Sequence, residues 1–143
     1  MRLAILATRF NEELVDKLVE DARETLIELG VSPARIAEFR VPGSLELPVA
    51  ATWLSESDEY DGIIALGVVI RGETAHFEYV CQGALHGLVR VSIDSRIPIM
   101  FGVLTTDTVE QALARIEGPV EHKGADVARG LVQMIALRGS IAG

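Results

Sequence analysis

Short apolar runs alternate along the chain with longer segments whose apolar residues recur at helical spacing. Apolar runs predict strands over residues 3–7, 62–70 and 97–104, and alternation of apolar and polar residues predicts another over residues 36–41. The run over residues 62–70 is apolar on both faces, as a central strand covered by helices requires. Strands that alternate with helices in this way are typical of parallel α/β folds.

The first two helical segments have clear ends. The apolar spacing starts after Asn11, a favoured N-cap residue, and stops at Gly30, which favours the end of a helix. Ser44 caps a second, apolar helix that we expect to reach about Leu54. An acidic loop follows at residues 56–61.

Three further helices are predicted in the second half of the chain. The first covers about residues 74–94 and is apolar around most of its circumference. Asp107 and Glu110 have the spacing of a capping box, which opens a helix that ends near Gly118. The last helix covers about residues 123–137.

These elements predict a single domain over residues 1–143. Its fold class is α/β, a three-layer αβα sandwich on a four-stranded parallel sheet with flavodoxin-like strand order. Such sheets bind ligands beyond the carboxyl ends of their strands. We therefore expect four loops to meet in one site, at residues 8–11, 42–46, 71–76 and 105–107.

Composition narrows the classes of function. With 49% hydrophobic and 24% charged residues the chain is too apolar for disorder, but no apolar run reaches the roughly 18 residues of a membrane span. The net charge of -8 argues against nucleic acid or an anionic membrane as a partner. The single cysteine, Cys81, and a first apolar run too short for an export signal fit a cytoplasmic protein.

Charge is unevenly distributed along the chain. Residues 1–61 hold thirteen acidic and six basic side chains, whereas residues 62–143 hold eight and seven. The second part is therefore the better host for an anionic small molecule.

The segment at residues 67–76 carries the most chemical information. It leaves the buried strand through a glycine turn and enters a helix, whose free N–H groups and dipole favour an anion such as phosphate. Thr74 adds a hydroxyl, and His76 can transfer protons near neutral pH. Taken alone, the segment is explained equally well by a plain N-cap at Thr74 and a surface histidine, because no phosphate-loop glycine signature is present.

Other candidate residues have simpler local explanations. Phe10 stands where the ligand crevice is expected, but by itself it is better explained as closing the hydrophobic core. Glu46 lies in the first turn of a helix, where a carboxylate suits the dipole anyway. Arg115 and Lys123 are basic residues, whose side chains are usually exposed to solvent at the surface.

Neither a metal centre nor a covalent catalytic centre is indicated. His86 and His122 have no carboxylate or cysteine at ligand spacing. Cys81 and Trp53 are expected to pack within helices. No Ser/His/Asp or Cys/His signature is present.

Five sequence blocks, in order along nearly the whole chain, resemble one enzyme family. They are RFN at 9–11, VPGSLELP at 41–48, GVVIRGETAHFEY at 67–79, FGVLTTDT at 101–108 with EQA at 110–112, and KGA at 123–125. In these blocks the chain is similar to the lumazine synthases of riboflavin biosynthesis. The blocks coincide with the strand ends that the apolar pattern selects.

The resemblance implies condensation of 5-amino-6-(D-ribitylamino)uracil with 3,4-dihydroxy-2-butanone 4-phosphate. The products are 6,7-dimethyl-8-ribityllumazine, phosphate and water, and no cofactor is implied. Every step moves protons, but holding two substrates in register can itself supply several kcal/mol of the barrier. We therefore expect His76, which matches the family's proton-transfer residue, to assist rather than to be indispensable.

The resemblance also implies a binding role for each matching residue. Phe10 stacks on the pyrimidine ring. Three consecutive residues offer that ring backbone contacts: Val68, Val69 and Ile70. Three others hold the ribityl chain: Ser44, Leu45 and Glu46.

At the other end of the site, the resemblance implies that the butanone phosphate is bound by Glu73, Thr74 and Arg115. Phe101 and Lys123 line the ligand from a neighbouring subunit. The site would then lie between the subunits of a homo-oligomer.

Several positions depart from the family pattern. Leu45 stands where an aromatic is frequent, Ala75 where proline is frequent, and His122 where asparagine commonly precedes the lysine. Met1 begins almost directly on the first strand, without the segment that many members add to a neighbour's sheet. We therefore expect a homopentamer as the minimum unit, alone or in an assembly of pentamers, rather than a 60-subunit shell.

Three alternatives stay open. A catalytically silent lumazine- or flavin-binding or shell-forming homologue is disfavoured because His76, Arg115 and Lys123 are present together. A flavodoxin-like nucleotide-binding domain lacks its glycine signature here. The related archaeal type of riboflavin synthase would differ in its product.

Overall fold

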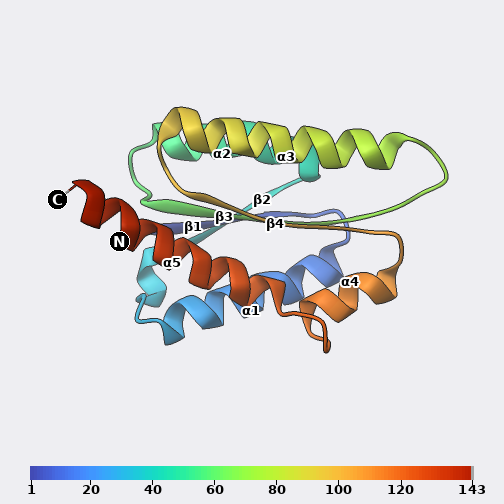
Figure 1. Cartoon of the computed structure of the whole chain (residues 1–143), viewed down its shortest axis with the longest axis horizontal. Coiled ribbons are helices and arrows are strands. Elements are labelled where there is room, and N and C mark those ends of the chain that lie inside the picture. The colour runs from blue at the N-terminus through green and yellow to red at the C-terminus, as the bar shows by residue number, and fades with distance from the viewer. Residues whose placement is uncertain (143) are drawn as a thin grey trace.

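Four parallel strands form the sheet at the centre of the computed structural model, which describes residues 1–142 (Figure 1). The strands are β1 (Leu3–Thr8), β2 (Ile36–Val41), β3 (Gly62–Ile70) and β4 (Ile99–Thr106). They lie in the order β2-β1-β3-β4, and every neighbouring pair is parallel. This order confirms the predicted flavodoxin-like α/β fold. It also brings the carboxyl ends of all four strands to one edge.

Within the described residues, five α-helices cover the sheet in two layers (Figure 1). One face carries α1 (Glu12–Glu28), α4 (Val109–Ile116) and α5 (Lys123–Ala142). The other face carries α2 (Leu47–Glu56) and α3 (His76–Ser95). Two short 3-10 helices, η1 (Pro33–Arg35) and η2 (Ser44–Glu46), precede β2 and α2. Within residues 1–142, no helix is both long and apolar enough to cross a membrane.

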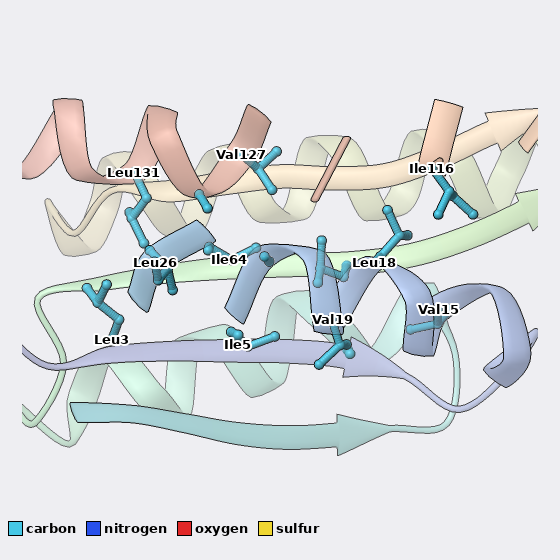
Figure 2. Packing of buried hydrophobic residues seen from close by; sticks show 14 of the residues in the cluster. Leu3, Ile5, Val15, Leu18, Val19, Leu26, Ile64, Ile116, Val127 and Leu131 are labelled. Carbon is cyan, nitrogen blue, oxygen red and sulfur yellow. The ribbon is translucent and has the colours of Figure 1, made fainter. Parts of the chain in front are cut away.

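The hydrophobic core lies in two layers, one on each face of the sheet. Figure 2 shows the layer between the strands and the helices α1 and α5. Its fully buried members include residues from both sides: Leu3, Ile5 and Ile64 from the strands, and Leu18, Leu26 and Leu131 from the helices. Burying a side chain of this kind contributes about 1.5–3 kcal/mol. Both central strands, β1 and β3, thus contact core side chains on two faces, and for β3 this is what the apolar run over residues 62–70 predicted.

The strand β4 begins two residues later than predicted. Arg96 has a left-handed backbone (φ 62°) that ends α3 and turns the chain. The carbonyl of Pro98 still accepts the N–H of Ile63 at 3.0 Å, but a proline has no N–H to continue the ladder. Regular pairing therefore starts at Ile99, opposite Ile63.

Two predicted N-caps differ in the structure. Ser44 does not cap α2: it opens the 3-10 turn η2, and α2 starts at Leu47 with Pro48 in its first turn. Proline is tolerated there because the first N–H groups of a helix have no intrahelical partner. Asn11 stands at the start of α1 in a left-handed conformation, but its side chain donates to the Val68 carbonyl at 2.7 Å instead of capping the helix.

The capping box of α4 is one residue later than predicted. Thr108 accepts the Gln111 N–H at 3.1 Å, and the Gln111 side chain accepts the Thr108 N–H at 3.2 Å. The carboxylate of Asp107 is instead bound by Arg71. The prediction of Asp107 and Glu110 was therefore wrong about the pair, although the helix is in the expected place.

Two aromatic side chains are not packed as their local sequence suggested. Phe10 is 73% exposed, so it does not close the hydrophobic core. Trp53 is 66% exposed on the outer side of α2. Cys81 is partly buried in α3.

Candidate functional site

Loops that follow different strands are joined at the carboxyl edge of the sheet. The Phe10 N–H donates to the Pro42 carbonyl at 3.1 Å, which ties the loop after β1 to the loop after β2. The Arg71 N–H donates to the Thr106 carbonyl at 2.9 Å, which ties the end of β3 to the end of β4. These bonds join the four predicted loops in two pairs at this edge, but residues 105–107 are not among the residues that line the cleft described next.

A cleft of about 540 Å³ opens between three of these loops and the first turns of α3. Its volume lies in the range of small-molecule sites, and its wall is mostly apolar. Nine residues predicted for the site line it: Phe10, Ser44, Leu45, Glu46, Val68, Val69, Ile70, Thr74 and His76.

The end of β3 forms one wall of the cleft, and a glycine allows the adjacent turn to approach it. A Cβ atom at Gly67 would come within 3.0 Å of the Ser44 hydroxyl oxygen and 3.2 Å of a Thr8 methyl carbon. Ser44 is nevertheless buried beside this strand and reaches the cleft. The glycine therefore lets η2 lie directly against β3.

The mouth of the cleft carries two exposed apolar side chains. Phe10 extends from the loop after β1, with most of its surface in solvent. Leu45 extends from η2 and packs against Gly83 of α3. The contact is so close that a Cβ atom at Gly83 would be only 2.6 Å from the Leu45 Cδ2. An exposed aromatic beside an apolar cleft can stack on a flat ligand.

The start of α3 supplies the polar end of the cleft. The helix begins at His76, two residues after the predicted Thr74, with Ala75 at the N-cap position. The backbone N–H of His76 lies 3.4 Å from the Thr74 hydroxyl oxygen, which accepts it. Both side chains are exposed and line the cleft. A hydroxyl, an imidazole and a helix N-terminus thus lie together, which suits an anion and a proton transfer.

Comparison with known proteins gives one consistent result. The family model described as 6,7-dimethyl-8-ribityllumazine synthase matches residues 1–139. The chain belongs to this family. A relative of that name from Salinibacter ruber is 42% identical over 99% of this chain and 91% of its own length. One from Pediococcus pentosaceus is 41% identical, with 99% and 90% covered, and one from Desulfatibacillum aliphaticivorans is 43% identical, with 95% and 88% covered.

Four residues that the lumazine synthase resemblance assigns to the site do not line the cleft: Glu73, Phe101, Arg115 and Lys123. Glu73 is exposed in the loop before α3. Phe101 is partly buried against the core layer on the side of α2 and α3. Arg115 is in α4, where its guanidinium donates to the Gln111 carbonyl at 3.1 Å, and Lys123 is the first residue of α5. The last two lie on helices across the sheet from α3.

Five cleft residues had no individual role in the prediction: Pro42, Gly43, Gly72, Phe77 and Val80. The first three lie in the loops 42–46 and 71–76 that were predicted to form the site, whereas Phe77 and Val80 were missed. Phe77 directly follows His76, and Val80 follows it by four residues, so helical spacing from His76 points to Val80. The two glycines and the proline belong to turns, whose side of approach depends on tertiary packing.

Two ionisable groups in α3 have shifted pKa values. Hydrogen bonding to the Arg71 guanidinium holds the pKa of Glu78 below its ordinary value. Burial is the main reason that the pKa of the Cys81 thiol is raised, and the Glu78 carboxylate adds to it. A raised thiol pKa disfavours the reactive thiolate, so Cys81 is not suited to be a nucleophile. Among the described residues, no three His, Cys, Asp or Glu side chains are grouped to hold a metal ion.

Proposed function

We propose that the protein is a lumazine synthase, which condenses 5-amino-6-(D-ribitylamino)uracil with 3,4-dihydroxy-2-butanone 4-phosphate. The products are 6,7-dimethyl-8-ribityllumazine, phosphate and water. Membership of the family supports the reaction. One observation supports the location: eight residues that the resemblance assigns to the two substrates, and His76, line a single cleft at the carboxyl edge of the sheet.

The pyrimidine substrate occupies the apolar part of the cleft. Phe10 stacks on its ring, because this aromatic is exposed at the mouth and has no core contact to give up. The strand end at residues 68–70 offers backbone groups to the ring, since these residues line the cleft. The ribityl chain lies along η2, where it meets Ser44, Leu45 and Glu46.

The butanone phosphate occupies the end of the cleft at the start of α3. Free N–H groups and the helix dipole stabilise its phosphate there, and the Thr74 hydroxyl adds a hydrogen bond. Glu73 takes part through its backbone, because its own carboxylate would repel the phosphate. Arg115 completes the anion site by a charge-assisted contact.

The chemistry needs proton transfer at each step. The 5-amino group attacks the ketone carbon, and loss of water leaves an imine. Removal of a proton next to the imine expels phosphate, and attack by the ribityl-substituted nitrogen closes the ring with loss of a second water. His76 accepts and returns these protons, since its imidazole lies at the polar end of the cleft.

The assembly that completes the site is a homopentamer or a larger assembly of pentamers. Only three residues of α3 are buried in the single chain, Val80, Ala84 and Leu88. Leu85, Val89 and Ile93 are exposed and four residues apart, so they form one apolar row. A second copy that covers such a row can also bring Phe101, Lys123 and Arg115 to the cleft of its neighbour.

One domain over residues 1–143, located in the cytoplasm, completes the proposal. The core layers on both faces of one sheet support the single domain. The single cysteine, which excludes an internal disulfide, is compatible with a reducing compartment.

The decisive experiment mixes the purified protein with both substrates and follows lumazine absorbance together with phosphate release. We expect one phosphate for each lumazine formed, and neither product when one substrate is omitted. Binding of the pyrimidine without product would identify a silent homologue. Riboflavin formed from added lumazine would identify the archaeal type of riboflavin synthase.

A further inference from the structure

Arg71 joins three parts of the molecule at the polar end of the cleft. It is the first residue after β3, and its backbone N–H is bound to the end of β4. Its side chain donates from Nε to the Asp107 carboxylate at 2.6 Å and from Nη1 to the Glu78 carboxylate in the first turn of α3. The guanidinium carbon also lies 4.4 Å from the centre of the Phe77 ring.

These contacts close the loop over residues 72–75, which precedes α3. In the described part of the chain, hydrogen bonds from this loop reach only the first residues of α3: Thr74 accepts the His76 N–H, and Ala75 accepts the N–H groups of Glu78 and Tyr79. The loop therefore has no hydrogen bond of its own to the sheet. Its position depends on its two ends, and the Arg71 side chain ties those ends together.

The same contacts reach the wall of the cleft. Phe77 lines the cleft beside His76, and its ring also contacts the Arg71 guanidinium. A guanidinium over an aromatic face is an attractive arrangement that also fixes the orientation of the ring. Arg71 itself is not among the lining residues of the cleft.

We propose that Arg71 is a positioning residue: by binding Glu78, Asp107 and Phe77 it holds the loop over residues 72–75, and with it Thr74 and His76, in the geometry that receives the butanone phosphate. The inference rests on the proposed function. Two carboxylates already satisfy the guanidinium, so its charge is balanced within the protein and it acts through the loop rather than as a phosphate ligand. The planar fork of arginine is required to bind two carboxylates while stacking on a ring.

The first test replaces Arg71 by Gln and uses Arg90→Gln as its matched control. Arg90 forms an exposed ion pair with Asp94 in the same helix, so both variants remove one arginine and at least one ion pair near or within α3. For Arg71→Gln we expect the KM for the butanone phosphate to rise about tenfold, because the anion site is displaced, and kcat to fall by up to about a hundredfold, which a misplacement of about 1 Å can cause. The KM for the pyrimidine substrate should stay the same in Arg71→Gln. In Arg90→Gln, kcat and the KM for the butanone phosphate should both keep their wild-type values.

The second test separates positioning from direct phosphate binding. The double variant Glu78→Gln with Asp107→Asn removes both carboxylates and leaves the Arg71 charge free. Positioning predicts a raised KM for the butanone phosphate, as in Arg71→Gln. An unchanged or lower KM would show that the freed guanidinium binds phosphate directly, and would overturn the proposal.

Arg71→Lys is a third test, because lysine keeps the positive charge but lacks the planar guanidinium group that can bind two carboxylates. We expect only partial rescue of the KM relative to Arg71→Gln, and full rescue would contradict the proposed geometry. Circular dichroism and the assembled mass identify any variant that fails to fold, and the remaining variants then decide. If the wild-type protein makes no lumazine, the proposed function fails. If it is active and the Arg71 variants keep the wild-type KM and kcat, only this inference fails.

Discussion

Pro48 of α2 lies against Gly87 of α3 so closely that a Cβ atom on the glycine would be 2.5 Å from the proline Cγ. Leu45 has the same relationship with Gly83, at 2.6 Å and one turn earlier in α3. The two glycines thus form a strip along α3 that receives η2 and the start of α2. This close approach brings Ser44 to the cleft, because η2 is held between α3 and β3.

Gly87→Ala should therefore destabilise the protein. Alanine in a helix interior is favoured over glycine by about 1 kcal/mol, but the new methyl group would overlap a rigid proline ring, and overpacking typically costs about 1–3 kcal/mol. We expect a net loss of roughly 1 kcal/mol in the free energy of unfolding, measured by urea denaturation at fixed protein concentration. Gly139→Ala in α5 is the control, since an added Cβ there meets nothing within 4 Å and should stabilise the helix. A higher free energy of unfolding in both variants would mean that α2 can move away from α3 at no cost.

His76→Ala should lower turnover without abolishing it. Proton transfer by a positioned side chain typically contributes about a hundred- to ten-thousandfold, whereas the cleft would still hold the two substrates together. The measurement is kcat for lumazine formation under saturating substrates. His86→Ala removes an imidazole from the same helix outside the cleft and is the matched control. A folded His76→Ala protein with no activity at all would contradict an assisting role.

Val89→Glu should break the assembly. A charge in the exposed apolar row of α3 has no partner when a second copy covers it, so association becomes unfavourable. Leu29→Glu is the control, because Leu29 is 46% exposed and Val89 is 47% exposed, but Leu29 lies at the end of α1 in the other helical layer. Light scattering coupled to size exclusion gives the mass. We expect about five chains or a multiple of five for the wild type and the control, and a smaller species for Val89→Glu. A wild-type monomer with activity would exclude a shared site.

Glu78→Gln should change the pH dependence of stability. Because Arg71 lowers the pKa of Glu78 in the folded protein, the ionised carboxylate favours the folded state. Its contribution is complete above the ordinary value of 4.5 and is lost as the pH falls through the lowered pKa. The variant should therefore be less stable than the wild type at pH 7, and the difference in urea midpoint should vanish in acid. Glu20→Gln, an exposed residue of α1, should show no such pH-dependent difference.

The elements could be predicted from the sequence because their patterns are local. The strand patterns identified all four strands, and β2 and β3 have the predicted bounds. β3 is an apolar run because it is covered by helices on both faces, whereas β2 was recognised from its alternating residues. Gly30 ends the first helical segment with a φ of 99°, a conformation that glycine adopts readily. Right-handed connections limit the possible strand orders, and the flavodoxin-like order preferred among them is the one observed.

Much of the candidate site could also be predicted from the sequence, because the carboxyl ends of parallel strands meet at one edge of the sheet. Residues directly after the strands therefore belonged to the predicted site, and Phe10, Ser44 and His76 line one cleft. The exposure of Phe10 was not predictable from its neighbours. An aromatic after a buried strand can turn toward the core or toward solvent, and the backbone contact of its loop with Pro42 decides which.

The sequence by itself therefore determined the elements, their order and the edge where the site lies. Only the tertiary structure decided which polar groups became partners. Asn11 binds the Val68 carbonyl rather than capping its helix, and Asp107 binds Arg71 while Thr108 caps α4. The physical reason is that a short polar side chain can bond several nearby groups at similar free energy, and the choice depends on the donors and acceptors that distant segments bring within about 3 Å.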